Sequence, residues 1–130
     1  MKTVLVDSSV WIDYFRRKES ESGVVLDSLI DYGLISVNDL ILAELIPFLR
    51  LKRKRQIIEL LMSVERLPFR IDWAEIMDLQ TANLRHGVNN VGIPDLIILQ
   101  NSIQNNASLF SLDKHFALMR KHIKFDLFMP

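Results

Sequence analysis

The sequence predicts an α/β fold built on a parallel sheet. Short runs rich in β-branched residues alternate with longer segments of helical period, and Gly or Pro stands where several segments end. Strands that alternate with helices form βα units, whose parallel strands are covered by helices on both faces. The 130 residues are about one domain's length, and we expect residues 1–130 to form a single domain.

Candidate strands and helices follow one another along the chain. A buried strand shows as a short apolar run, whereas a helix shows apolar positions three or four residues apart. The expected strands are 3–6, 34–37, 108–112, 125–128 and the shorter run 67–69. The expected helices are 8–16, 21–32, 39–49, 52–65, 72–86 and 95–105.

Glycines and prolines mark the boundaries between these segments. Gly33 and Gly87 each end an expected helix. Ile93 stands before Pro94, which favours extended geometry just ahead of the last long helix. Pro47 should kink or end the helix 39–49, because proline cannot donate the helical hydrogen bond.

Composition narrows the class of protein. The chain has no cysteine, which excludes disulfides, thiolate zinc sites and cysteine nucleophiles. Acidic residues interrupt every apolar run well short of the roughly 20 residues that cross a bilayer, so we expect a soluble cytoplasmic protein. The net charge is +0, yet cations gather at 16–18 and 50–55, either as solvated helix faces or as a site for a polyanion or partner.

Three aspartates should meet at one edge of the sheet. Asp7 follows the first strand, Asp113 follows the strand 108–112, and Asp95 opens a helix. In right-handed βα units the carboxyl ends of the strands and the amino ends of the helices share one edge. Each aspartate also has a simpler explanation as a helix N-cap.

Glu44 resists that simpler explanation. Its helical neighbours are Leu40, Ile41 and Phe48, so its face of the helix is apolar and should pack inward. An ionised carboxylate buried without a partner is expensive. The alternatives are a distant basic partner or a site shared with the three aspartates.

Four converging carboxylates would need a cation or protons between them. Two unit charges about 4 Å apart repel by roughly 4 kcal/mol at an effective dielectric of about 20. An all-oxygen set of Asp and Glu suits Mg²⁺ or Mn²⁺, which can activate water for attack on a phosphodiester. Ser9 and Ser111 each lie two residues from an aspartate, where their hydroxyls would orient a ligand carboxylate or serve only as turn residues.

Four stretches together resemble a known family. VLVDSSVWIDYF, LILAEL, GIPDLIIL and LFSLDKHF are similar, in order and spacing, to the acidic motifs of PIN-domain ribonucleases, most closely the VapC-like toxins of type II toxin–antitoxin systems. The resemblance implies a three-layer α/β/α fold with a central parallel sheet of about five strands, Mg²⁺- or Mn²⁺-dependent RNA cleavage, a cognate antitoxin and a homodimer. It assigns Asp7, Glu44, Asp95 and Asp113 to the catalytic and metal site, with Ser9 assisting.

The chain departs from the family pattern at a few positions. His115 stands where many members have a further acid, which puts a second metal position in doubt, and we expect it to be a surface residue. Leu99 and Gln100 replace small residues, which should alter packing rather than chemistry. The resemblance also gives the basic runs a use, holding RNA phosphates around the acidic pocket, with these candidates: Arg16, Arg17, Arg50, Lys52 and Arg53.

The sequence therefore predicts a metal-dependent endoribonuclease that acts as a toxin. One rival is a catalytically inactive PIN-like module that binds RNA or protein. Another is an enzyme or receiver phosphorylated on Asp7, although that class leaves Glu44 unexplained.

Overall fold

The computed structural model describes residues 2–130. The elements follow the order β1 (Val4–Val6), α1 (Ser8–Arg16), α2 (Glu21–Asp31), β2 (Ile35–Val37), α3 (Asp39–Leu51), α4 (Arg55–Ser63), β3 (Glu65–Arg66), α5 (Trp73–Arg85), α6 (Ile93–Gln104), β4 (Ser108–Phe110) and α7 (Lys114–Met119).

The sheet is parallel, with the strand order β3-β2-β1-β4. In register, Val4 of β1 lies beside Ile35 of β2 and Ser108 of β4. The predicted α/β class and parallel sheet are confirmed, with four strands where about five were expected. The expected strand 125–128 contributes only a parallel bridge between Leu109 and Leu127.

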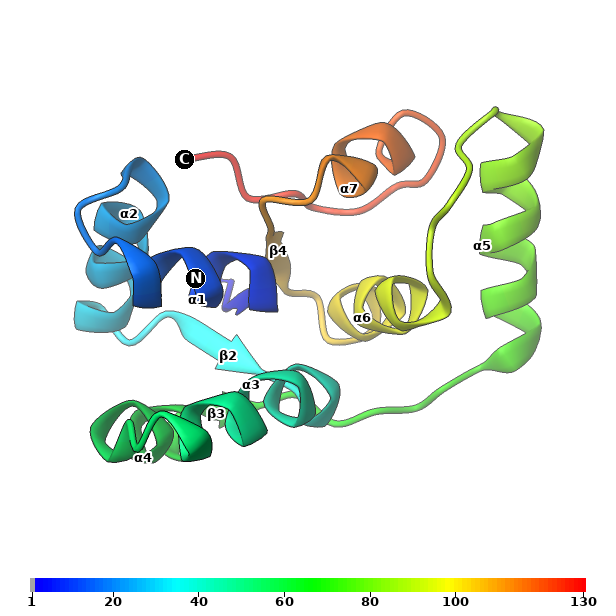
Figure 1. Ribbon diagram of the computed structural model, residues 1–130. Helices are drawn as coiled ribbons and strands as arrows, with labels where there is room; N and C mark the ends of the chain where they lie inside the picture. The colour runs from blue at the N-terminus through cyan, green and yellow to red at the C-terminus, as the bar shows by residue number, and fades with distance from the viewer. Residues whose placement is uncertain (1) are drawn as a thin grey trace.

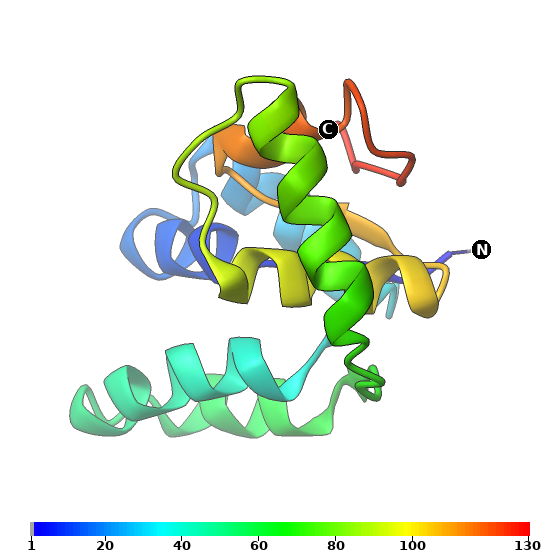
Figure 2. The same ribbon diagram turned by 90° about the vertical axis from the view of Figure 1, so that its right-hand side faces the viewer.

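Helices cover both sides of this sheet (Figure 1). Helices α1 and α2 pack together on one side, and α5 and α6 pack together on the other. Helices α3 and α4 run side by side as a hairpin, with α3 also against α1 (Figure 2). The carboxyl ends of β1 and β4 are neighbours because these strands pair in parallel.

Two local expectations were misplaced, and one helix was not expected. The predicted strand 67–69 is displaced to Glu65–Arg66, an exposed edge strand whose polar residues show no apolar run. The predicted helix 52–65 begins only at Arg55 and ends at Ser63. Helix α7 was missed because six residues are too few to display a helical period.

Proline does not end α3. The helix runs through Pro47 to Leu51. Pro47 and Ala43, whose carbonyl loses its helical donor, are both exposed, so water can satisfy that carbonyl. Ile93 likewise is the first residue of α6 rather than an extended residue before it, with Gly92 as the N-cap.

Buried polar side chains join α3 to the far side of the core. Asn38 caps α3 by accepting a hydrogen bond from the N–H of Ile41, and its Nδ2 donates to Oδ1 of Asn101 on α6 at 3.0 Å. Asn101 in turn donates to the carbonyl of Pro68. Because buried polar groups are costly to leave unpaired, this chain of bonds sets the position at which α3 begins.

None of the helices within residues 2–130 combines the length and apolarity needed to cross a bilayer.

Candidate active site

Asp7 stands between β1 and α1 but does not cap the helix with its side chain. It is only 5% exposed and occupies the N-cap position without a capping hydrogen bond from its carboxylate. Its backbone N–H donates to the carbonyl of Phe110 on β4 at 2.9 Å. The backbone therefore ties Asp7 to the neighbouring strand and leaves its carboxylate available for another task.

Two serine hydroxyls hold that carboxylate. Ser9 Oγ donates to Oδ2 of Asp7 at 2.9 Å, and Ser111 Oγ donates to the same oxygen at 2.8 Å. Each hydroxyl oxygen also accepts a backbone N–H at 3.0 Å, from Leu112 and Asp113 respectively. Both serine hydroxyls thus hydrogen-bond the Asp7 carboxylate in addition to the backbone of the turn that follows β4, and their role in orienting a ligand carboxylate stays a prediction.

The other oxygen of Asp7, Oδ1, accepts no hydrogen bond from residues 2–130. Within that same part of the chain, the fully buried side-chain nitrogens and oxygens without a partner are Trp11 Nε1 and Ser36 Oγ. Oδ1 is therefore accessible rather than sealed in the core. One oxygen of Asp7 is held by two serine hydroxyls, and the other has no hydrogen-bond partner within residues 2–130.

Asp113 does cap a helix, as the simpler explanation proposed. Its Oδ1 accepts the backbone N–H of His115 at 2.9 Å at the start of α7. The Nδ1 atom of the His115 ring lies 2.9 Å from the same oxygen. His115 is partly exposed, as expected for a surface residue, and its ring also contacts Asp113, which the sequence did not predict.

Asp95 lies in the first turn of α6, three residues beyond the N-cap Gly92. It is half-buried, and burial is the main reason that its pKa is raised above its ordinary value. The negative charges of Asp113 and Asp7 raise the pKa of Asp95 further, while His115 opposes them. The negative charges of both other aspartates therefore act on Asp95 at the edge of the sheet.

Glu44 is placed differently from the prediction. It does not pack inward, because Glu44 and Phe48 lie on the exposed face of α3 while Ile41 and Leu45 face the core. Of its expected apolar neighbours, Phe48 lines a surface hollow of about 460 Å³ together with Glu44. Helical spacing shows which residues share a face of α3 with Glu44, but it does not show whether that face packs against the core or lies at the surface.

The pKa of Glu44 is nevertheless affected by the charges of the aspartates. Partial burial raises its pKa above the ordinary value, and the charge of Asp7 adds to that effect. A hydrogen bond from Ser8 acts in the opposite direction, and Asp95 raises the pKa slightly more. The electrostatic links Glu44–Asp7, Asp7–Asp95 and Asp95–Asp113 connect all four predicted acids.

The donor set fits a hard divalent cation in kind. All four acids offer only oxygen, their charges oppose one another, and an ion would relieve that repulsion. Within residues 2–130, no three His, Asp or Glu side chains are grouped closely enough to hold a metal ion in this conformation. The four acids interact electrostatically at the same edge of the sheet, and their assignment as metal ligands stays a prediction.

The five predicted RNA-binding cations do not lie in one place. Arg16, Lys52 and Arg53 line hollows between α1, α3 and the α3–α4 turn. Arg17 instead lines a hollow on the other side of α1, and exposed Arg50 lines none of these three hollows. The sequence shows that these residues belong to two basic runs, but it does not show toward which surface each side chain points.

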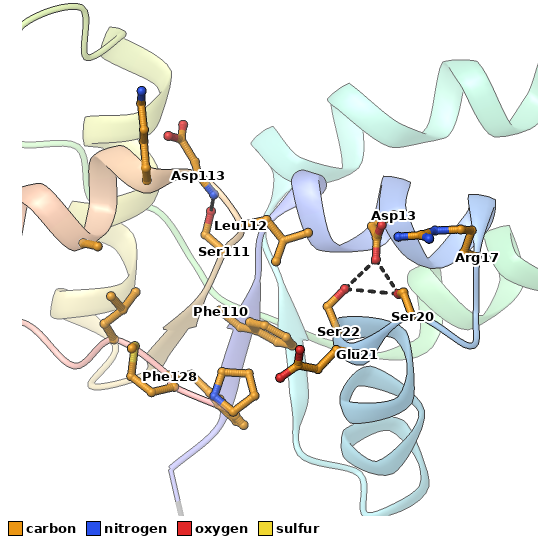
Figure 3. A pocket seen from close by; sticks show the side chains of 15 residues that line it. Asp13, Arg17, Ser20, Glu21, Ser22, Phe110, Ser111, Leu112, Asp113 and Phe128 are labelled. Carbon is orange, nitrogen blue, oxygen red and sulfur yellow. Dashed lines mark hydrogen bonds between the residues drawn. The ribbon is translucent and has the colours of Figure 1, made fainter.

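The hollow that contains Arg17 lies beside the acidic edge (Figure 3). It has a volume of about 520 Å³ and includes Ser111 and Asp113 in its wall. In its floor, Asp13 accepts hydrogen bonds from Ser20 at 2.6 Å and Ser22 at 2.5 Å, which lower the pKa of Asp13. Asp13, which sequence reasoning passed over, anchors the turn between α1 and α2.

One family model matches most of the chain. Residues 4–121 match the family model described as "PIN domain". Among curated proteins no sequence matches the chain.

Solved structures share the fold at low sequence identity. VapBC2 from Rickettsia felis, bound to a DNA fragment from their promoter, matches with a TM-score of 0.71 and 18% identity over 95% of this chain and 98% of that one. FitAcB from Neisseria gonorrhoeae matches with a TM-score of 0.67 and 20% identity, covering 98% and 97%. DNA-bound VapBC from Salmonella typhimurium matches with a TM-score of 0.68 and 17% identity, covering 90% and 92%.

Proposed function

The chain belongs to the PIN-domain family, and on that premise we propose that it is a Mg²⁺- or Mn²⁺-dependent endoribonuclease, the toxin of a toxin–antitoxin pair. The observation that carries the proposal is the electrostatic linkage of Asp7, Glu44, Asp95 and Asp113 at one sheet edge. The charges of neighbouring acids help to raise the pKa values of Glu44 and Asp95, and a purely structural role gives no reason for that arrangement.

The residues would divide the work by their surroundings. Asp7 presents its free Oδ1 while the two serine hydroxyls prevent its carboxylate from rotating away. Asp95 and Glu44, half-exposed and mutually repelled, would turn toward a cation, with Asp113 contributing its remaining oxygen. A bound Mg²⁺ or Mn²⁺ supplies the acidity that activates water and the charge that neutralises the phosphate.

The reaction proposed is hydrolysis of an RNA phosphodiester. The oxygen of a water attacks phosphorus, the bond from phosphorus to the 3′-oxygen breaks, and the proton lost by the water ends on the leaving oxygen through solvent. The products are a 3′-hydroxyl and a 5′-phosphate.

Cleavage of RNA by the purified chain tests the proposal. We expect cutting with Mg²⁺, none with EDTA, and a loss of at least about a hundredfold for Asp95→Asn, since ligand carboxylates act on the chemical step. Asp78→Asn, which removes an exposed carboxylate from α5, is the matched control and should leave cleavage unchanged. Cutting that ignores both EDTA and Asp95→Asn would refute metal-dependent cleavage.

A non-cutting PIN-like module that binds RNA or protein is the second candidate. It is favoured by one observation, the absence within residues 2–130 of three acids already grouped to hold a metal. Thermal unfolding with increasing Mg²⁺ separates the two candidates, because an ion that binds only the folded chain raises its melting temperature. An unchanged melting temperature favours the non-cutting module.

Partners follow from the same premise. The structural neighbours are VapBC and FitAB proteins, and we propose a cognate antitoxin for this chain, an RNA substrate and a homodimer in the cytoplasm. Co-expression with the product of an adjacent gene, followed by co-purification, tests the first of these.

A further inference from the structure

A buried amide lies at the junction of α5, α7 and the loop that joins α5 to α6. Asn83 of α5 is 0% exposed, and Met119, the last residue of α7, is also fully buried. Figure 2 shows the carboxyl end of α5 beside α7, and the loop to α6 begins at that same end. An apolar residue would fill such a site at lower cost, because an amide removed from water must find partners for its polar atoms.

Every polar atom of the Asn83 side chain has a partner. Its Nδ2 donates to Gln80 Oε1 at 3.1 Å and to Met119 Sδ at 3.3 Å. Its Oδ1 accepts from His122 Nε2, in the turn that follows α7, at 2.7 Å. Its backbone carbonyl accepts the N–H of Val88 at 2.8 Å at the end of α5. Asn83 thus joins α5 both to α7 and to the start of the loop.

The direction of these hydrogen bonds is fixed from one end. The carbonyl of Val91 can only accept, so the Gln80 atom that lies 2.7 Å from it is the amide nitrogen. Gln80 Oε1 then accepts from Asn83 Nδ2, which leaves Asn83 Oδ1 for His122. His122 therefore donates through Nε2, and the parallel ring of His86 stacks on it at 4.4 Å. The bonds run in one consistent order from Val91 to His122.

Both ends of this chain of bonds lead to an acid of the candidate site. Met119 ends the six-residue helix α7, which begins directly after Asp113. Val91 immediately precedes Gly92, the N-cap of α6, whose carbonyl accepts the N–H of Asp95 at 3.2 Å. After burial, the charge of Asp113 contributes most to the raised pKa of Asp95, so these two carboxylates interact. Their separation depends on how α7 and the loop are held relative to each other.

The loop and α7 both need support from the rest of the chain. A helix of six residues is too short to be stable alone. In the loop, Gly87 and Asn90 have φ values of 74° and 67°, and a left-handed residue other than glycine persists only where its surroundings hold it. A fully satisfied network of buried hydrogen bonds specifies one arrangement more sharply than apolar packing does. The bonds of Asn83 supply such support to both segments.

We propose that Asn83 is a positioning residue that sets the separation of Asp95 and Asp113. It acts on Asp95 through Gln80 and the loop, and on Asp113 through α7. It touches neither substrate nor metal. This inference rests on the proposed function for the use of the two acids, and it adds a residue that lies outside the four motif stretches.

Hydrogen exchange of the metal-free chain, without RNA, is the first test. Asn83→Ala removes the side-chain bonds and places a strong helix former in α5. We expect the N–H groups of Asp95 and Phe116, in the first turns of α6 and α7, to exchange at least about fivefold faster, the effect of one net hydrogen bond. Ile76→Val, which removes a buried methyl group from α5 and none of these bonds, is the matched control and should leave both rates unchanged.

Cleavage kinetics give the second test. Asn83→Ala should lower kcat about tenfold and raise the Mg²⁺ concentration that gives half the maximal rate, with KM for RNA unchanged, because only the placement of the acids is altered. His122→Leu should lose part of the same activity. His122→Gln, which keeps an amide donor for Asn83 Oδ1, should recover it. A smaller folded fraction alone would lower kcat without changing the Mg²⁺ dependence.

The two tests separate this inference from the proposed nuclease. Unchanged exchange at Asp95 and Phe116 in Asn83→Ala would overturn the inference whether or not the chain cuts RNA. Faster exchange with an unchanged kcat and Mg²⁺ dependence in an active chain would also overturn it, since the two segments would then move without effect on the acids. Faster exchange at both groups in a chain whose parent cuts no RNA would support the positioning of the two carboxylates and refute only the nuclease.

Discussion

Replacing Ser111 with alanine removes the hydrogen bond that joins β4 to the carboxylate of Asp7. Ser111 Oγ donates to Asp7 at 2.8 Å and accepts the Asp113 N–H at 3.0 Å. A hydrogen bond to a charged group contributes roughly 1.5–3 kcal/mol, and Ser9 continues to hold the same oxygen. We therefore expect the free energy of unfolding to fall by about 2 kcal/mol.

Urea unfolding measures this change, and thermal unfolding should show a melting temperature lower by about 6–10 °C for a domain of this size. Ser36→Ala is the matched control. Ser36 is fully buried on β2, and its hydroxyl has no hydrogen-bond partner. Its removal should leave stability unchanged or increase it by up to about 1 kcal/mol, because an unsatisfied buried hydroxyl is a cost.

The different outcomes expected for the two serine variants make the argument testable. A Ser111→Ala chain as stable as the parent would show that the bond to Asp7 contributes nothing net. A double-mutant cycle with Asp7→Asn adds a direct measure, since the coupling between positions 7 and 111 should be about 1–2 kcal/mol. A coupling near zero would mean that Ser111 acts only through its local turn.

Three further expectations follow from the geometry. The fold raises the pKa values of Glu44 and Asp95, so in the absence of metal their contribution to the free energy of unfolding declines as the pH rises above their ordinary values of 4.5 and 3.8. Urea unfolding at several pH values should show a shallower decline for Glu44→Gln than for the parent chain. A decline parallel to that of the parent chain would contradict this expectation. Burial and the stacked His86 ring, 4.4 Å away, lower the pKa of His122, so stability should fall as pH drops through 6.5; NMR titration should show a higher pKa for His122 in His86→Gln. Arg53→Gly should stabilise the chain by about 0.5 kcal/mol, because the gain from relieving the left-handed φ of Arg53 exceeds the cost of the extra freedom that glycine gives the unfolded state. A lower melting temperature in calorimetry would exclude this.

Much of the architecture was predictable from local pattern. The apolar runs beginning at Val4 and Ile35 are β1 and β2, and Gly33 and Gly87 end helices with φ values of 64° and 74°. Those features depend on neighbouring residues alone. The edge strand at Glu65 was misplaced because its exposed, polar sequence carries no such pattern.

Candidate site residues were identified with mixed success for a related reason. The two serines near Asp7 and Asp113 were recognised by spacing, and their hydroxyls do hydrogen-bond the Asp7 carboxylate. The inward packing of Glu44 was wrong, because helical spacing shows which residues share a face but not what lies opposite. His115 was expected on the surface, where it is partly exposed, and its contact with Asp113 was not predicted.

The sequence by itself determined the α/β class, the acids at strand and helix ends, and the order of motifs that identifies the family. These depend on short-range periodicity and on residue type, which are written in the chain. Only the tertiary structure decided which oxygen of Asp7 stays free, which acids influence one another, and that cations from two distant basic runs line one hollow. Those properties depend on where segments far apart in the chain meet, and long-range packing sets that arrangement.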